Sequence, residues 1–154
     1  MNSNIAVIGL IIWAVISVTM TAVSPGPLSD GNDFLAGFVT HEFLSFMGVV
    51  VTITLASAAN LFVEMNKLED RHDREIFPEA KADVRDSAYA LVGALIAAIV
   101  VVVVKPWLAP FGDRGETAAN CAALGVMAFS VFIMIDLVQA AFNLDPRKVP
   151  DAKS

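Results

Sequence analysis

The chain has 154 residues, of which 56% are hydrophobic and 17% charged, and its formal net charge is −6. A soluble domain averages about 45–50% apolar and about 25% charged residues, so this composition argues against a water-soluble globule. The negative charge argues against a nucleic-acid-binding protein, which needs a basic face. The single cysteine excludes a disulfide framework within the chain.

Charged residues are distributed unevenly, and four stretches contain none. These stretches are residues 1–29, 43–63, 87–104 and 117–135. A helix needs about 20 mostly apolar residues to cross a bilayer, and an open strand would leave backbone groups unpaired in hydrocarbon. We therefore predict an all-α, polytopic membrane protein that forms a single transmembrane domain over residues 1–154, a four-helix transmembrane bundle. The predicted spans are residues 5–23, 43–63, 87–104 and 118–141.

The first apolar stretch, 5–23, ends at the turn signal Ser24-Pro25-Gly26-Pro27. A cleaved signal peptide is the alternative interpretation, because small residues surround Val23. However, residues 1–4 contain no Lys or Arg, and the apolar run is longer than the about 7–15 residues of the apolar region in a signal peptide. We expect a retained helix.

The second helix is expected to begin near Phe34, after Asp30, Asn32 and Asp33, which favour helix starts. No proline interrupts it before Pro78, which suits the first turn of a new helix. We therefore expect cytoplasmic helical extensions between spans 2 and 3, forming a hairpin over residues 64–86. Apolar residues that could pair the two extensions are Met65, Leu68, Ile76, Ala80 and Val84.

The orientation follows from the basic residues in the connections. With four spans, the 64–86 hairpin and the tail 143–154 share one side and hold eight Lys and Arg, whereas the other side holds Lys105 and Arg114. Positive residues favour the cytoplasmic side. We predict an inner (plasma) membrane protein, surrounded by membrane lipid, with both termini in the cytoplasm.

The polar residue that stands out within a predicted span is Asp136. It lies about 9 Å inside the cytoplasmic end of the fourth span by the helical rise, where a carboxylate costs roughly 2.5–3.5 kcal/mol. Asn60 and Ser57 on the second span and Gln139 on the fourth lie at similar depth, which predicts an intramembrane polar cluster. This cluster either holds helices together by hydrogen bonds or forms an ion or proton site.

Two surfaces could bind proteins. The 64–86 hairpin has five basic and eight acidic side chains; it is either a solvated face or a partner-binding surface through Lys67, Arg71 and Arg74. Small residues four apart in the spans favour close helix packing, either within the chain or in a homo-oligomer. These pairs are Gly93 with Ala97, Ala94 with Ala98, Ala118 with Ala122, and Cys121 with Gly125.

Motifs for catalysis or metal binding do not emerge from the sequence. The stretch His41-Glu42-Phe43-Leu44-Ser45 has serine where a metalloprotease motif needs a second histidine, so we expect no metal site, and we also expect no cofactor. The leading hypothesis is a non-enzymatic accessory or scaffold component of a membrane assembly. The alternatives are a small ion- or proton-coupled transporter or channel using Asp136, and a membrane-perturbing effector gated through the hairpin.

Overall fold

A computed structural model of the protein describes residues 3–72 and 76–143, and these residues are helical apart from short connections. The helices, in chain order, are α1 (Ser3–Val23), η1 (Gly26–Leu28), α2 (Asp33–Phe38), α3 (His41–His72), α4 (Pro78–Leu108), η2 (Ala109–Phe111) and α5 (Asp113–Asn143). The described part of the chain contains no strand, which confirms the all-α prediction.

Within the described residues, three helical stretches are long and apolar enough to cross a membrane: His41–Arg71, Pro78–Phe111 and Asp113–Phe142. A fourth crossing is present if Ile8–Val23 and Gly26–Phe38, which are bent by 116° relative to each other, count as one span. The composition therefore correctly predicts a helical protein with several helices that are long and apolar enough to span a membrane. Much of their apolar surface is exposed, including Ile96 and Val103, as expected for helices whose outer faces contact lipid rather than water.

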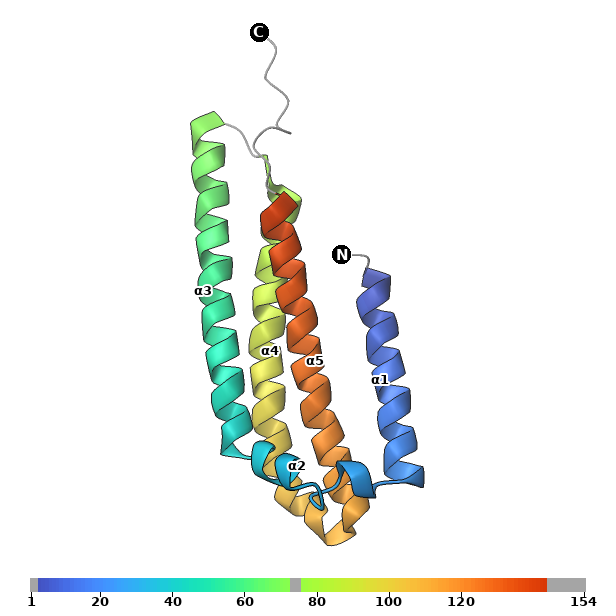
Figure 1. Cartoon of the computed structure of the whole chain (residues 1–154). Coiled ribbons are helices and arrows are strands. Elements are labelled where there is room, and N and C mark those ends of the chain that lie inside the picture. The colour runs from blue at the N-terminus through green and yellow to red at the C-terminus, as the bar shows by residue number, and fades with distance from the viewer. Residues whose placement is uncertain (1–2, 73–75, 144–154) are drawn as a thin grey trace.

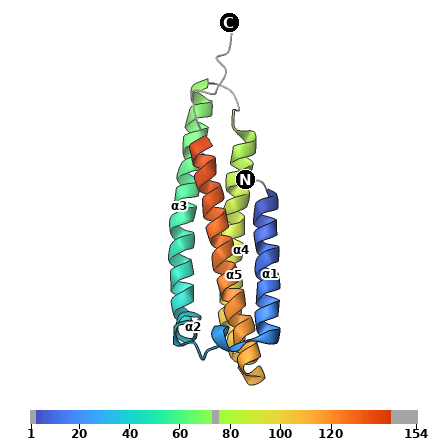
Figure 2. The ribbon, with the colours of Figure 1, turned by 45° about the vertical axis from the view of Figure 1, so that its right-hand side comes forward.

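Helices α4 and α5 lie between α3 on one side and α1 on the other (Figures 1 and 2). Helix α4 packs extensively against both α3 and α5, while α1 packs against α5 and has no extensive contact with α3 or α4. The predicted four-helix bundle is therefore not confirmed: α1 attaches to one edge of a unit formed by α3, α4 and α5. Sequence patterns predict helices but do not specify which neighbours they contact.

The core lies between α3, α4 and α5. Phe43 and Met47 of α3 and Leu91 of α4 are fully buried there. Small residues allow the helices to approach, as expected from their spacing: Ala94 and Ala98 of α4 are buried in this core. The other predicted small-residue pairs line a groove between α1, α4 and α5, as described below.

The start of α3 differs from the prediction. The helix expected from Phe34 is divided into α2 and α3, because the backbone leaves the helical conformation at Val39 (φ −80°, ψ 60°). The hydroxyl of Thr40 donates to the carbonyl of Gly37 at 2.6 Å and accepts from the amide of Glu42 at 3.4 Å. Serine and threonine hydroxyls compete with helical hydrogen bonds in this way.

Polar contacts fasten the segment between α1 and α3 to the end of the α4–α5 pair. Lys105 Nζ donates to Asp30 Oδ1 at 2.8 Å, and Asn120 Nδ2 donates to the same oxygen at 3.0 Å. The backbone amide of Asp30 donates to Glu116 Oε2 at 3.0 Å, and Thr117 Oγ1 donates to the Pro25 carbonyl at 2.7 Å. These bonds explain how a segment with two prolines and a sharp bend is held in one conformation.

Candidate functional site

The four residues of the predicted intramembrane cluster lie on two different sides of α5. Asp136 and Gln139 line a small pocket of about 80 Å³ together with Asp83 and Ser87 of α4. Ser57 and Asn60 instead line a groove of about 450 Å³ between α3 and α5. Leu137 lines both cavities and is buried between them.

Helical geometry explains this division. Each residue turns the helix by about 100°, so the α5 residues that line the α3 groove, Met134, Leu137 and Val138, share one face. Asp136 and Gln139 point roughly the opposite way. Similar depth in the membrane therefore does not place Asp136 and Asn60 in the same cavity, and Asp136 shares its pocket with Asp83 and Ser87 of α4 instead.

Buried polar side chains in the middle of the helices bond to their own helix. Thr54 donates to the Val50 carbonyl at 2.7 Å, and Ser130 donates to the Val126 carbonyl at 2.9 Å. In the exposed α3 groove, Ser57 likewise donates to the Ile53 carbonyl at 3.0 Å. Each of these hydroxyls is satisfied within its own helix. They therefore do not form a chain of polar groups between Asp136 and the opposite end of the helices.

The two helical extensions next to the connection between α3 and α4 are joined by Glu69. This side chain is only 8% exposed, and its Oε1 accepts from the backbone amides of Ile76 at 3.0 Å and Phe77 at 2.9 Å. Phe77 is the N-cap of α4 and has no cap of its own. The carboxylate thus satisfies free amides at the start of the next helix, where a negative charge is favoured.

Lys81 completes this contact. Its ammonium group pairs with Glu69 Oε2 and lies 5.6 Å from the ring centroid of Phe62. The hydrogen bond from Lys81, followed by that from the Phe77 amide, holds the pKa of Glu69 below its ordinary value of 4.5. Beneath this polar contact, Met65 and Val84 are fully buried against each other's helices within the core cluster.

The predicted partner-binding residues have different surroundings. Lys67 pairs with Glu64 at 2.7 Å, and both side chains are more than half exposed. Arg71 is exposed at the end of α3. Arg74 lies outside the described residues. The hairpin end therefore combines a fixed contact through Glu69 with charged side chains that face solvent.

Two features were not anticipated from the sequence. Glu69 is one of eight acidic residues in 64–86, and its contacts seven and eight residues further on match no local capping pattern. The Asp30–Lys105 pair joins residues 75 positions apart. A charged residue beside an apolar run predicts a position at the membrane edge, but it does not reveal a distant partner.

Comparisons with protein family models, with curated proteins and with solved structures found no match. The fold therefore defines the class of protein: an α-helical protein with three or four helices able to span a membrane.

Proposed function

We propose that this protein is a non-enzymatic accessory or scaffold component of an inner-membrane assembly, and that it binds a cytoplasmic protein partner through the hairpin formed by the end of α3 and the start of α4. This proposal takes the positive-inside orientation, in which the hairpin and both termini lie in the cytoplasm. The partner surface comprises Lys67, Arg71 and Arg74.

The observation that carries this proposal is the fixed geometry of the hairpin. Glu69 links α3 to the first amides of α4, and Met65 and Val84 pack beneath it. Helix α3 reaches beyond the start of α1 in both views (Figures 1 and 2). A pair of helices that such contacts join loses little conformational freedom on binding, and its exposed charges can contact a partner, which favours a docking role.

The transporter alternative has one supporting feature, the pocket that Asp136 shares with Asp83 and Ser87. A transport path would also need polar groups further along the helices. Thr54 and Ser130 bond to their own backbone in that region. We therefore favour the scaffold over the transporter, and we expect Asp136→Asn to leave ion and proton flux in reconstituted vesicles unchanged.

The direct test reverses the charge of the hairpin. The triple variant Lys67→Glu, Arg71→Glu, Arg74→Glu is compared with the wild-type chain by quantitative co-purification in mild detergent after cross-linking in cells. The proposal predicts that the partner recovered with the wild-type chain is lost from the triple variant. Arg114→Gln, an exposed change at the opposite end of the helices, is the matched control and retains the partner. Equal recovery with the triple variant contradicts the proposal.

A further inference from the structure

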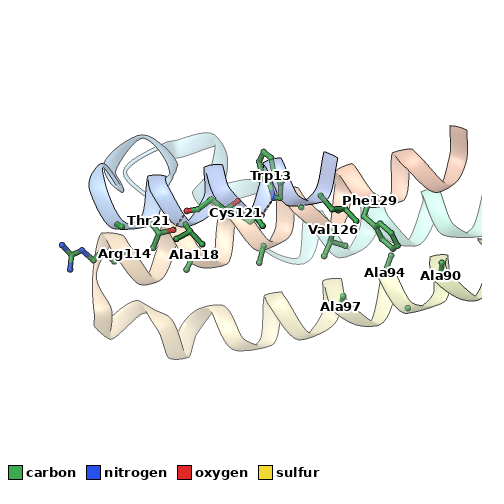
Figure 3. A pocket seen from close by; sticks show the side chains of 18 residues that line it. Trp13, Thr21, Ala90, Ala94, Ala97, Arg114, Ala118, Cys121, Val126 and Phe129 are labelled. Carbon is green, nitrogen blue, oxygen red and sulfur yellow. Dashed lines mark hydrogen bonds between the residues drawn. The ribbon is translucent and has the colours of Figure 1, made fainter. Parts of the chain in front are cut away.

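A large apolar groove lies on the side of α5 that α1 covers only in part. Its volume is about 1150 Å³, and it is lined by α1, α4 and α5. It exists because α1 packs against α5 without closing onto α4. Figure 3 shows the lining side chains, which come from these three helices.

Small residues create the room. Gly93 and Ala97 of α4 and Ala118 and Ala122 of α5 line the groove, and a Cβ added at Gly93 would meet no atom within 4 Å. Of the polar side chains in the lining, Thr21 donates to the Ser17 carbonyl of its own helix at 2.8 Å, and Trp13 donates to the Cys121 carbonyl at 3.3 Å. The walls therefore offer an occupant mainly apolar contact, which suits hydrocarbon.

The groove has one cationic end. Arg114 lines it next to the α4–α5 turn, at the end of the labelled row in Figure 3. The side chain is exposed, and within the described part of the chain no ion pair or hydrogen bond engages its guanidinium group. Arginine is well matched to phosphate oxygens. An apolar trough that ends at an unpaired guanidinium group complements a molecule with a hydrocarbon chain and a phosphate.

The length of the groove distinguishes a lipid from a helix. Its α5 lining runs from Arg114 to Phe129, which is about 22 Å at the rise of an α-helix. One bilayer leaflet with its headgroup region is about 20–22 Å thick, whereas a helix that crosses the hydrocarbon core needs about 30 Å. Beyond Phe129, the Phe132 ring lies against Gly9, so α1 and α5 are in contact there. The groove therefore matches one lipid molecule.

The charges at the end of the helices that carries Arg114 favour a zwitterionic headgroup. Residues 24–42 and 105–116 contain five carboxylates and two basic side chains, Lys105 and Arg114, and Lys105 is already paired with Asp30. The remaining acidic surroundings repel a headgroup with net negative charge. They attract an ammonium group, and the exposed Asp113 is adjacent to Arg114 in the chain.

We infer that this groove is a binding site for one zwitterionic phospholipid, with an acyl chain along the small residues of α4 and α5 and its phosphate at Arg114. This inference is independent of the proposed partner surface, which lies at the opposite end of the helices.

Trp13 provides a reporter, because it lines the groove and donates from Nε1 to the Cys121 carbonyl at 3.3 Å. In a Trp107→Phe background, which removes the other, 78% exposed tryptophan, the full-length protein in detergent is titrated with phosphatidylethanolamine carrying brominated acyl chains. We expect saturable quenching of Trp13 emission, and native mass spectrometry to detect one retained lipid per chain. Brominated phosphatidylglycerol should bind more weakly.

Three variants test the site. Gly93→Leu fills the groove and should weaken binding about tenfold or more, whereas Gly48→Leu, on α3 with equally open space, should not. Arg114→Gln, an exposed change, should weaken phosphatidylethanolamine binding about tenfold, the order of one charge-assisted hydrogen bond. Equal binding by Gly93→Leu and Gly48→Leu, or an equal or greater affinity for phosphatidylglycerol, would overturn the inference. A lipid-free dimer that Gly93→Leu dissociates would overturn it in favour of a second copy of this chain.

Discussion

At the scale of single residues, Glu69 shows how one carboxylate can determine the geometry of a helical hairpin. It accepts hydrogen bonds from the backbone amides of Ile76 and Phe77, just before α4, and pairs with Lys81. Glu64, on the same helix, pairs with the exposed Lys67. The two substitutions therefore have different consequences. Loss of Glu69 leaves the partly buried amides of Ile76 and Phe77, just before α4, without their acceptor, whereas loss of Glu64 leaves a solvated lysine.

We predict that Glu69→Gln increases the rate of amide hydrogen exchange at Ile76 and Phe77 by roughly tenfold or more, because a charge-assisted acceptor is replaced by a weaker neutral one. Exchange measured by mass spectrometry on the purified protein tests this. Glu64→Gln is the matched control and should leave exchange at both amides unchanged. Equal exchange in the two variants would show that Glu69 does not hold the hairpin.

The same contact predicts a pH dependence. The pKa of Glu69 is lowered in the folded protein, so the carboxylate contributes stability that is fully present above its ordinary value of 4.5 and is lost as the pH falls through the lower folded value. Exchange at Ile76 and Phe77, corrected for its intrinsic pH dependence, should therefore increase below about pH 4.5 in the wild-type chain. Glu69→Gln should show no such increase, and an increase of the same size in that variant would contradict the assignment.

Gly115 illustrates a second residue-scale constraint. A Cβ at this position would lie 2.0 Å from the Leu108 carbonyl oxygen, and the clash is with backbone. Gly115→Ala should therefore destabilise the folded chain by about 1–3 kcal/mol, the usual cost of overpacking. Gly48→Ala, which meets nothing within 4 Å, should be neutral or stabilising by up to about 1 kcal/mol. Unfolding in mixed detergent micelles measures the stability of both variants. A Gly115→Ala variant as stable as the wild type would contradict the close approach of Gly115 to the Leu108 carbonyl.

At the scale of elements, the segment from Ser24 to Thr40 depends on contacts far away in sequence. Burial raises the pKa of Asp30, but the hydrogen bonds from Lys105 and Asn120 outweigh it, so the net shift is downward. The ionised carboxylate is therefore the form that fixes this segment to the start of α5 and the end of α4. Lys105 is only 12% exposed, which limits the screening of the pair by water.

A double-mutant cycle of Asp30→Asn and Lys105→Met should give a coupling energy of about 1–2 kcal/mol in micelle unfolding, within the range found for residues in direct contact. Asp33→Asn combined with Lys105→Met is the control, because Asp33 forms no ion pair with Lys105 and should show no coupling. A coupling near zero for the first cycle would mean that the pair does not anchor the segment.

The sequence predicts the helices well because charge-free runs and the position of Pro78 are local signals. It predicts contacts poorly. The division between α2 and α3 depends on the Val39 backbone and Thr40, and the separation of Asp136 from Asn60 depends on which face of α5 meets α3. The position of α1 at the edge depends on its packing with α5, which no spacing pattern specifies. The two helices approach closely at Gly125 of α5, where an added Cβ would lie 2.7 Å from Trp13 Nε1.

At the scale of the whole molecule, the long helices lie side by side and give the protein two distinct ends. One end carries the hairpin fixed by Glu69, and the other carries the acidic segment fixed by Lys105 together with the exposed Arg114. The proposed partner surface and the inferred lipid site belong to opposite ends, so they should respond independently to substitution. Both depend on the chain crossing the membrane, and the proposed partner surface also depends on the hairpin lying in the cytoplasm.

That topology is the central claim, and site-specific cysteine labelling tests it most directly. In a Cys121→Ala background, Glu79→Cys places a single exposed thiol at the start of α4, and Phe111→Cys places one in η2, just after the end of α4. With a membrane-impermeant maleimide, the account predicts labelling of Phe111→Cys in spheroplasts and labelling of Glu79→Cys only after the membrane is opened. Labelling of Glu79→Cys in intact spheroplasts, or of both positions equally without opening the membrane, would contradict it.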